Sequence, residues 1–112
     1  MTDKVVVLVT VGNLREARRI AKALVAARLA ACVNLSPPVR SDYRWQGKME
    51  SAREVLLVIK TSREIFPELQ VEIRKLHSYA TPEIICLPII DGSREYLEWL
   101  AQAVKAVSQP QP

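Results

Sequence analysis

The residue best suited to bind a transition metal in this chain is its only histidine, His77. Imidazole nitrogen binds copper and zinc, and cysteine thiolate binds Cu(I). A ligand set of His77 with Glu83, or with a cysteine such as Cys32, would be chemically reasonable. The spacing adds no support, because the sequence contains no His-x-x-x-His and no Cys-x-x-Cys. We predict His77, Glu83 and Cys32 as metal ligands, and keep open the alternative that His77 ends a helix and hydrogen-bonds the loop after it.

A second group of residues mixes aromatic with ionisable side chains, as small-molecule pockets do. Its members beyond His77 and Glu83 are Tyr43, Trp45, Lys60 and Tyr79. We predict these four as residues of a ligand pocket or of a contact between subunits. The alternatives are that Tyr43 and Trp45 only pack in an interface, and that Lys60 and Glu83 only form an ion pair.

Signals of catalysis are missing from the sequence. Its three glycines, at positions 12, 47 and 92, form no loop that could cradle a phosphate. No nucleophile elbow occurs either. We therefore predict no catalytic residues, no enzymatic activity and no obligatory cofactor, although a site assembled across subunits would escape this test.

Length and charge bound the class of protein. The chain has 112 residues, enough for one domain, and a net charge of +4. No apolar run approaches the ~20 residues that span a bilayer, and the apolar start at 5–9 is too short for a signal peptide, so we expect a cytoplasmic protein without a membrane partner. The basic residues Arg15, Arg18, Arg19 and Lys22 share one helical face, which we interpret as a solvated surface because no aromatic residues accompany it. Nucleic acid is therefore not an expected partner.

The pattern of apolar residues predicts two strand–helix–strand repeats in a single domain, 1–107, followed by a flexible tail, 108–112. The continuous apolar run at 4–10 predicts a strand buried on both faces. Asn13 is expected to cap the first helix, a capping box at 61–64 the second, and Ser93 the third. The predicted strands are 4–10, 32–45 with a break at Pro37-Pro38, 48–60 and 83–90; the predicted helices are 13–29, one from about 61 to 76, and one after Ser93.

Prolines predict the order of the strands, because proline cannot donate to a ladder and belongs at sheet edges. Pro37-Pro38 interrupts the second strand and Pro88 lies in the fourth, whereas the first and third strands have none. The short turn at Gln46-Gly47 makes the second and third strands neighbours. The predicted fold is therefore α+β: a ferredoxin-like split βαβ sandwich with antiparallel sheet order 4-1-3-2, an additional C-terminal helix and an extended hairpin between strands two and three.

The hairpin is too long for one compact subunit. At ~3.3 Å per residue, a strand from Lys48 to Lys60 would extend ~43 Å, whereas a domain of this size has a radius of gyration of ~13 Å. One end must project, carrying Tyr43 and Trp45 with it. We predict that these aromatics pack on a neighbouring subunit, with their own helices as the alternative. The hairpin leaves the number of subunits open.

Five segments resemble the CutA (divalent-cation-tolerance) family, in the same order and spacing over nearly the whole chain. These are Ala30–Asn34, Tyr43–Lys48, Glu54–Thr61, His77–Ile84 and Tyr96–Leu100. The resemblance implies a homotrimer with sheet pairing between subunits, an architecture similar to the PII signalling proteins, and no established catalytic activity. It also implies a role in tolerance to divalent cations, with copper binding in some members.

The copper ligands of such members map only partly onto this chain. They are a cysteine that ends the first strand and two adjacent histidines, and the matching positions are Val9, Leu76 and His77. We therefore expect a trimeric protein that acts in divalent-cation (copper) tolerance by binding a metal ion. The alternative is a PII-like sensor of a small ligand, or a scaffolding trimer that acts through a protein partner.

Overall fold

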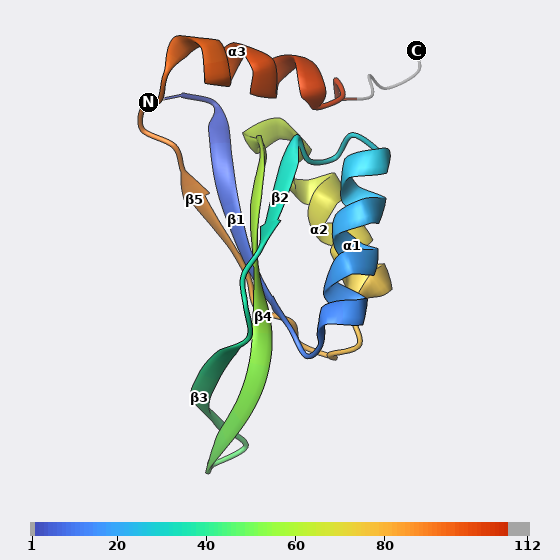
Figure 1. Cartoon of the computed structure of the whole chain (residues 1–112), viewed down its shortest axis with the longest axis vertical. Helices are drawn as coiled ribbons and strands as arrows, with labels where there is room; N and C mark the ends of the chain where they lie inside the picture. Colours follow the sequence, from blue (N-terminus) through green and yellow to red (C-terminus); the bar gives the residue numbers. More distant parts are fainter. Residues whose placement is uncertain (1, 108–112) are drawn as a thin grey trace.

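The computed structural model describes residues 2–107, and the predicted tail at 108–112 lies outside them. The described part is an α+β sandwich of one antiparallel sheet and three α-helices (Figure 1). Its elements are β1 (Lys4–Val11), α1 (Leu14–Ala26), β2 (Cys32–Leu35), β3 (Val39–Trp45), β4 (Lys48–Ser62), a 3₁₀ turn (Arg63–Ile65), α2 (Phe66–Leu76), β5 (Ile84–Pro88) and α3 (Arg94–Ala103).

The strand order is β2-β4-β1-β5, with β3 paired to the outer half of β4. This confirms the predicted order 4-1-3-2 when β2 and β3 are counted as one interrupted strand. Val7 of β1 pairs with Ile59 of β4 on one side and with Cys86 of β5 on the other. Pro88 ends the edge strand β5, and Pro37-Pro38 separates β2 from β3. These three prolines therefore lie outside the central strands β1 and β4.

Only one face of the sheet is covered by helices. Helices α1 and α2 lie side by side against it (Figure 1), and the buried residues of β1 alternate with half-buried ones. Val7 and Val9 point into the core with Ile20 and Leu24 of α1, whereas Val6 and Leu8 point to the other face. The prediction of a first strand buried on both faces is therefore wrong for the single chain, because no helix of the described residues packs over the second face.

The helix N-termini show which of the predicted caps form. Asn13 caps α1 as predicted, accepting the backbone N–H of Glu16 at 2.8 Å, and Ser93 caps α3 through the N–H of Tyr96. The capping box is wrong: β4 runs through Ser62, whose side chain caps nothing. The Thr61 hydroxyl, buried on the helix-covered face of β4, instead donates to the carbonyl of Leu29 at 2.7 Å.

Helix α1 ends at Ala26, three residues before the predicted end. Arg28 takes a left-handed conformation, φ 59°, and the N–H of Leu29 bonds the carbonyl of Leu24, as in a Schellman motif. Glycine normally occupies this position. The Arg28 guanidinium bonds the carbonyls of Gln102 and Ala103 at 2.6 and 3.1 Å, so it joins the C-terminal ends of α1 and α3.

The hairpin of β3 and β4 projects from the sandwich, as predicted (Figure 1). Its register runs from Val39 opposite Glu54 to Trp45 opposite Lys48, and its turn residues Gln46 and Gly47 both have positive φ. Tyr43 and Trp45 are 45% and 49% exposed. They therefore do not bury themselves on the helices of their own chain.

Candidate functional site

A cleft of about 640 Å³ runs along the hairpin, between β3 and the loop that joins α2 to β5. This volume falls in the range of small-molecule sites. Four of the residues predicted from the sequence line it: Tyr43, Trp45, Tyr79 and Glu83. The lining also contains Glu54 of β4 and Thr10 of β1, so the cleft reaches the sheet itself.

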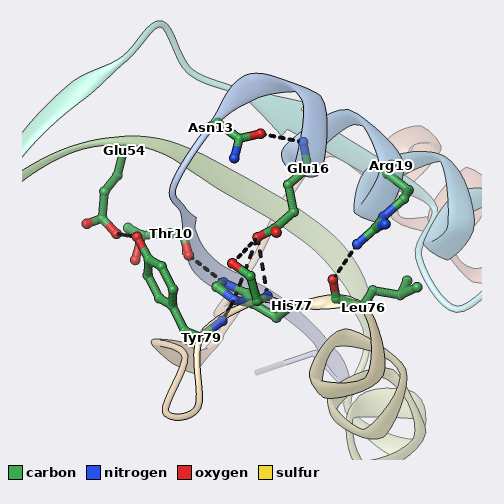
Figure 2. A network of polar contacts seen from close by, with 9 residues as sticks. Thr10, Asn13, Glu16, Arg19, Glu54, Leu76, His77 and Tyr79 are labelled. Atoms are coloured by element: carbon green, nitrogen blue, oxygen red, sulfur yellow. Dashed lines mark hydrogen bonds and ion pairs between the residues drawn. The ribbon is translucent and has the colours of Figure 1, made fainter.

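A hydrogen bond between Tyr79 and Glu54 forms the inner wall of the cleft (Figure 2). The Tyr79 hydroxyl donates to Oε2 of Glu54 at 2.9 Å, and Glu54 is only 7% exposed. Burial, together with the bond to Glu54 and its negative charge, raises the pKa of Tyr79 to about 12. The phenol therefore stays protonated at neutral pH and acts as a donor to the carboxylate.

His77 holds the Tyr79 loop from behind the cleft. The backbone N–H of Tyr79 donates to Nδ1 of His77 at 3.0 Å, and Nε2 lies 2.8 Å from the carbonyl of Thr10. Because Nδ1 accepts a hydrogen bond, Nε2 carries the proton and donates it to Thr10. His77 thus ends α2 and bonds the following loop, the second of the two interpretations drawn from the sequence. Both ring nitrogens are engaged, so a metal ion would have to displace one of these bonds.

Two further contacts fix the position of Tyr79. Glu16 of α1 accepts a hydrogen bond from the Ser78 hydroxyl at 3.1 Å, and its Oε2 lies 3.9 Å from Nδ1 of His77 (Figure 2). On the other side, a Cβ added to Gly12 would lie 3.1 Å from the Tyr79 hydroxyl oxygen. The absence of a side chain at Gly12 therefore allows the phenol to approach Glu54.

The predicted residues Lys60 and Cys32 lie elsewhere. They are cross-strand partners on β4 and β2, with the Lys60 Nζ 3.9 Å from the Cys32 Sγ, and Lys60 also bonds the side-chain carbonyl of Asn34. Lys60 is level with Val6 on β1, four residues along the strand from Thr10. One chain therefore does not bring Cys32 to His77, and Lys60 is not among the lining residues of the cleft.

Metal ligands do not cluster within a single chain. Among residues 2–107 there is no group of three or more His, Cys, Asp and Glu side chains that could hold a metal ion. Val9, which stands where copper-binding members have cysteine, is fully buried in the core. The two cysteines lie on opposite edge strands, and both are free thiols.

Glu54 is the important lining residue that the sequence did not single out. It lies where the polar hairpin meets the apolar run 55–59, in a segment rich in exposed charges. Strand alternation places Glu54, Leu56 and Val58 on the same face, which is the face without helices. The position of a charged residue at the start of a buried apolar run could have indicated Glu54 from the sequence.

Comparison with known proteins agrees with this fold. Residues 5–103 match the family model described as CutA1 divalent ion tolerance protein. This chain belongs to the CutA1 family. The divalent-cation tolerance protein CutA of Thermus thermophilus is 53% identical over 97 residues, which are 87% of this chain and 94% of that protein.

A second CutA protein and a solved structure of the first extend the comparison. Human protein CutA is 45% identical over 100 residues; these cover 89% of this chain but only 56% of the human protein. The solved structure of the Thermus thermophilus protein superposes with a TM-score of 0.89 at 50% identity, covering 91% of this chain and 99% of that one. Both support the family fold. Separately, no helix within residues 2–107 combines the length and apolar character needed to cross a membrane.

Proposed function

We propose that this CutA1-family chain forms a homotrimer that acts in divalent-cation tolerance by binding a ligand, not by catalysis, at the cleft beside Tyr79. The observation that carries the proposal is the position of this cleft at the margin of an uncovered apolar sheet face. A cytoplasmic location is part of the same proposal.

The uncovered face consists of side chains that a single chain leaves in contact with water. We call this surface the open face; it comprises Val6, Leu8, Leu56, Val58, Ile85 and Leu87. Ile85 and Leu87 are 45% and 44% exposed, and an apolar surface of this kind is typical of an interface. The unbroken apolar run of β1 is also typical of a strand covered on both sides. Other copies of the chain are the proposed cover, and the number three comes from the family resemblance.

The cleft adjoins the open face. Thr10, which lines the cleft, lies on the same side of β1 as Val6 and Leu8. A neighbouring chain seated on the open face would therefore reach the cleft and close one of its sides. This arrangement supports a ligand site between subunits.

A copper site would have to be shared between chains. The predicted set of His77, Glu83 and Cys32 does not meet within one chain, since Cys32 lies level with Val6 while Ile84, next to Glu83, pairs with Val9. We propose that any bound Cu²⁺ takes ligands from two subunits, with Glu83 of one and Cys32 of another as candidates. Carboxylate, thiolate and imidazole all bind copper.

Binding rather than catalysis is proposed because the cleft holds donors and acceptors without an activated nucleophile. Tyr79 is a protonated phenol at neutral pH, and the neighbouring imidazole of His77 uses both nitrogens in structural bonds. A catalytic base would need a free acceptor within reach of a substrate proton.

The assembly is tested by light scattering after gel filtration. Wild type is expected at three times the mass of one chain, and Leu8→Asp, which places a charge on the open face, at the mass of one chain with its far-UV circular dichroism retained. Lys22→Asp on the outer surface of α1 is the matched control and should stay trimeric. A wild-type monomer, or a Leu8→Asp variant that remains a trimer, would contradict the proposed interface.

The metal is tested by titrating Cu²⁺ into the trimer in a calorimeter. Glu83→Gln and Cys32→Ser are each expected to weaken binding at least tenfold, whereas Cys86→Ser, on the opposite edge strand, should leave it unchanged. Equal binding by all four proteins would remove Glu83 and Cys32 from the site. Absence of copper binding to wild type would remove the metal from the proposal.

A further inference from the structure

We propose that the cleft beside Tyr79 binds a small organic cation, such as a methylated or primary alkylammonium ion, between its aromatic rings and Glu54. This inference rests on the proposed function, which makes the cleft a binding site, and goes further by assigning the class of ligand.

Aromatic rings form the outer part of the cleft. Tyr43 and Trp45 come from one face of β3 and Tyr79 from the loop after α2. All three are between 38% and 49% exposed, so their faces remain available in the single chain. Aromatic faces attract ammonium groups within about 6 Å, and tryptophan is the strongest of them.

The charge of the cleft is negative although the chain carries a net +4. The lining contains three carboxylates, Asp42, Glu54 and Glu83, and one basic residue, Arg40. The Nε of Arg40 lies 3.0 Å from Oδ1 of Asp42, so this pair neutralises itself. Glu54 and Glu83 then remain as two uncompensated negative charges, which favour a cation.

Glu54 has no cationic partner among the described residues. It is 7% exposed, and its single hydrogen bond among the described residues comes from the neutral Tyr79 phenol to Oε2. No basic group of those residues lies within 4.0 Å of it, and Oε1 accepts no hydrogen bond there. No buried side-chain oxygen of the described residues lacks a partner, so Oε1 is open to the cleft, where it can accept a charge-assisted hydrogen bond from a bound cation.

Within one chain, this cleft fits an organic cation better than a bare metal ion, whose proposed ligands come from two subunits. The carboxylates of the described residues do not converge into a group of three that could ligate a metal. An alkylammonium ion needs no closed ligand shell, because its apolar groups contact aromatic rings while its charge faces a carboxylate. The volume of about 640 Å³ accommodates an ion of this size.

Choline and its uncharged carbon isostere dimethylbutanol provide the test, because they share a shape and differ in charge. The chain has two tryptophans, so Trp99→Phe leaves Trp45, which lines the cleft, as the sole source of tryptophan fluorescence. In this background choline is expected to quench Trp45 fluorescence saturably, and to bind at least tenfold more tightly than dimethylbutanol. Equal binding of the two, or no binding of choline, would overturn the proposal.

Substitutions of the carboxylates identify the binding groups. Glu54→Gln keeps an acceptor for Tyr79 but removes the charge, and is expected to weaken choline binding at least tenfold without affecting dimethylbutanol. Glu64→Gln, an exposed residue of the 3₁₀ turn, is the matched control and should bind like wild type. If Glu54→Gln binds choline as well as wild type does, Glu54 is not the partner and the proposal fails.

The proposed function is tested independently of the organic cation. Light scattering and the Cu²⁺ titration report the trimer and its metal whether or not choline binds. If a trimer forms and choline does not bind, while Trp45 fluorescence in the Trp99→Phe background changes when Leu8→Asp is added, the neighbouring chain itself fills the cleft. That outcome overturns the organic cation and leaves the assembly standing.

Discussion

Both faces of the central sheet carry apolar side chains, but only one is covered by helices in the single chain. Val7 and Val9 are completely buried under α1 and α2, whereas Val6 and Leu8, their neighbours on β1, are only partly buried. The covered face supplies the hydrophobic burial that holds the fold. The open face carries the features that point outward: the apolar surface, the carboxylate of Glu54 and the cleft. Alternate residues of the same strands therefore serve different ends: one set forms the core, and the other forms the open face and reaches the cleft.

Truncating a side chain on the covered face should have the largest effect. Leu57 is fully buried, so Leu57→Ala is expected to lower the free energy of unfolding by about 2–5 kcal/mol. Val58→Ala on the open face should cost less than about 1 kcal/mol when both changes are made in a Leu8→Asp monomer, because Val58 is half-exposed there. Urea denaturation measures both. Equal losses would mean that the two faces do not differ in the isolated chain.

The link between α1 and α3 is expected to have an intermediate effect. Arg28→Ala removes the guanidinium bonds to Gln102 and Ala103 while keeping a strained left-handed residue, and should cost about 1–2 kcal/mol. Arg28→Gly loses the same bonds but relieves the strain, so it should be more stable than Arg28→Ala by about 1 kcal/mol. Thermal unfolding compares them with Arg18→Ala, an exposed control on α1. An alanine variant as stable as glycine would contradict the strain.

The Tyr79–Glu54 bond on the open side should produce a pH effect. The folded pKa of Tyr79, about 12, is raised above its ordinary value of 10.0. A raised pKa stabilises the folded state below the ordinary value, and this contribution is lost as the pH rises through about 12. Tyrosinate absorbance should therefore show a late titration that disappears in Tyr79→Phe and moves to lower pH in Glu54→Gln. An unchanged titration in Glu54→Gln would rule out the carboxylate as a cause.

The smallest expected effect is at the hairpin turn, far from both faces. Gln46 and Gly47 have φ of 51° and 79°, the pattern of a type I′ turn, in which asparagine is favoured at the first position. Gln46→Asn should raise the free energy of unfolding by a few tenths of a kcal/mol. Differential scanning calorimetry of the two proteins detects this change. A lower melting temperature would argue against a I′ turn.

Local signals with one physical solution predicted most of the fold. Pro37-Pro38 and Pro88 have no place in a central strand, and Asn13 and Ser93 cap helices because they precede apolar helical patterns. The capping box at 61–64 failed because the pairing of Thr61 with Val5 extends β4 as far as Ser62. Local propensity is easily overridden where a strand already has a partner.

The site was predicted less completely because it depends on register. Tyr43, Trp45, Tyr79 and Glu83 share a cleft, as their mixed chemistry indicated. Lys60 has the same chemistry, yet it lies opposite Cys32, because β4 places it at the other end of the sheet from Glu54. The residues around Lys60 do not indicate how far it lies from Glu54 in the folded chain. Glu54 was overlooked for the converse reason: its burial comes from Tyr79, which is distant in sequence.

The length of β4 also bears on how the chain folds. Its outer half pairs with β3 across a tight turn, so Trp45 meets Lys48 at almost no cost in loop closure, whereas its inner half must find β1, with Lys4 opposite Ser62. Local pairings form in microseconds and distant ones more slowly. We expect the projecting hairpin, the least buried part of the native chain, to form first and to set the register in which β1 and β2 later dock.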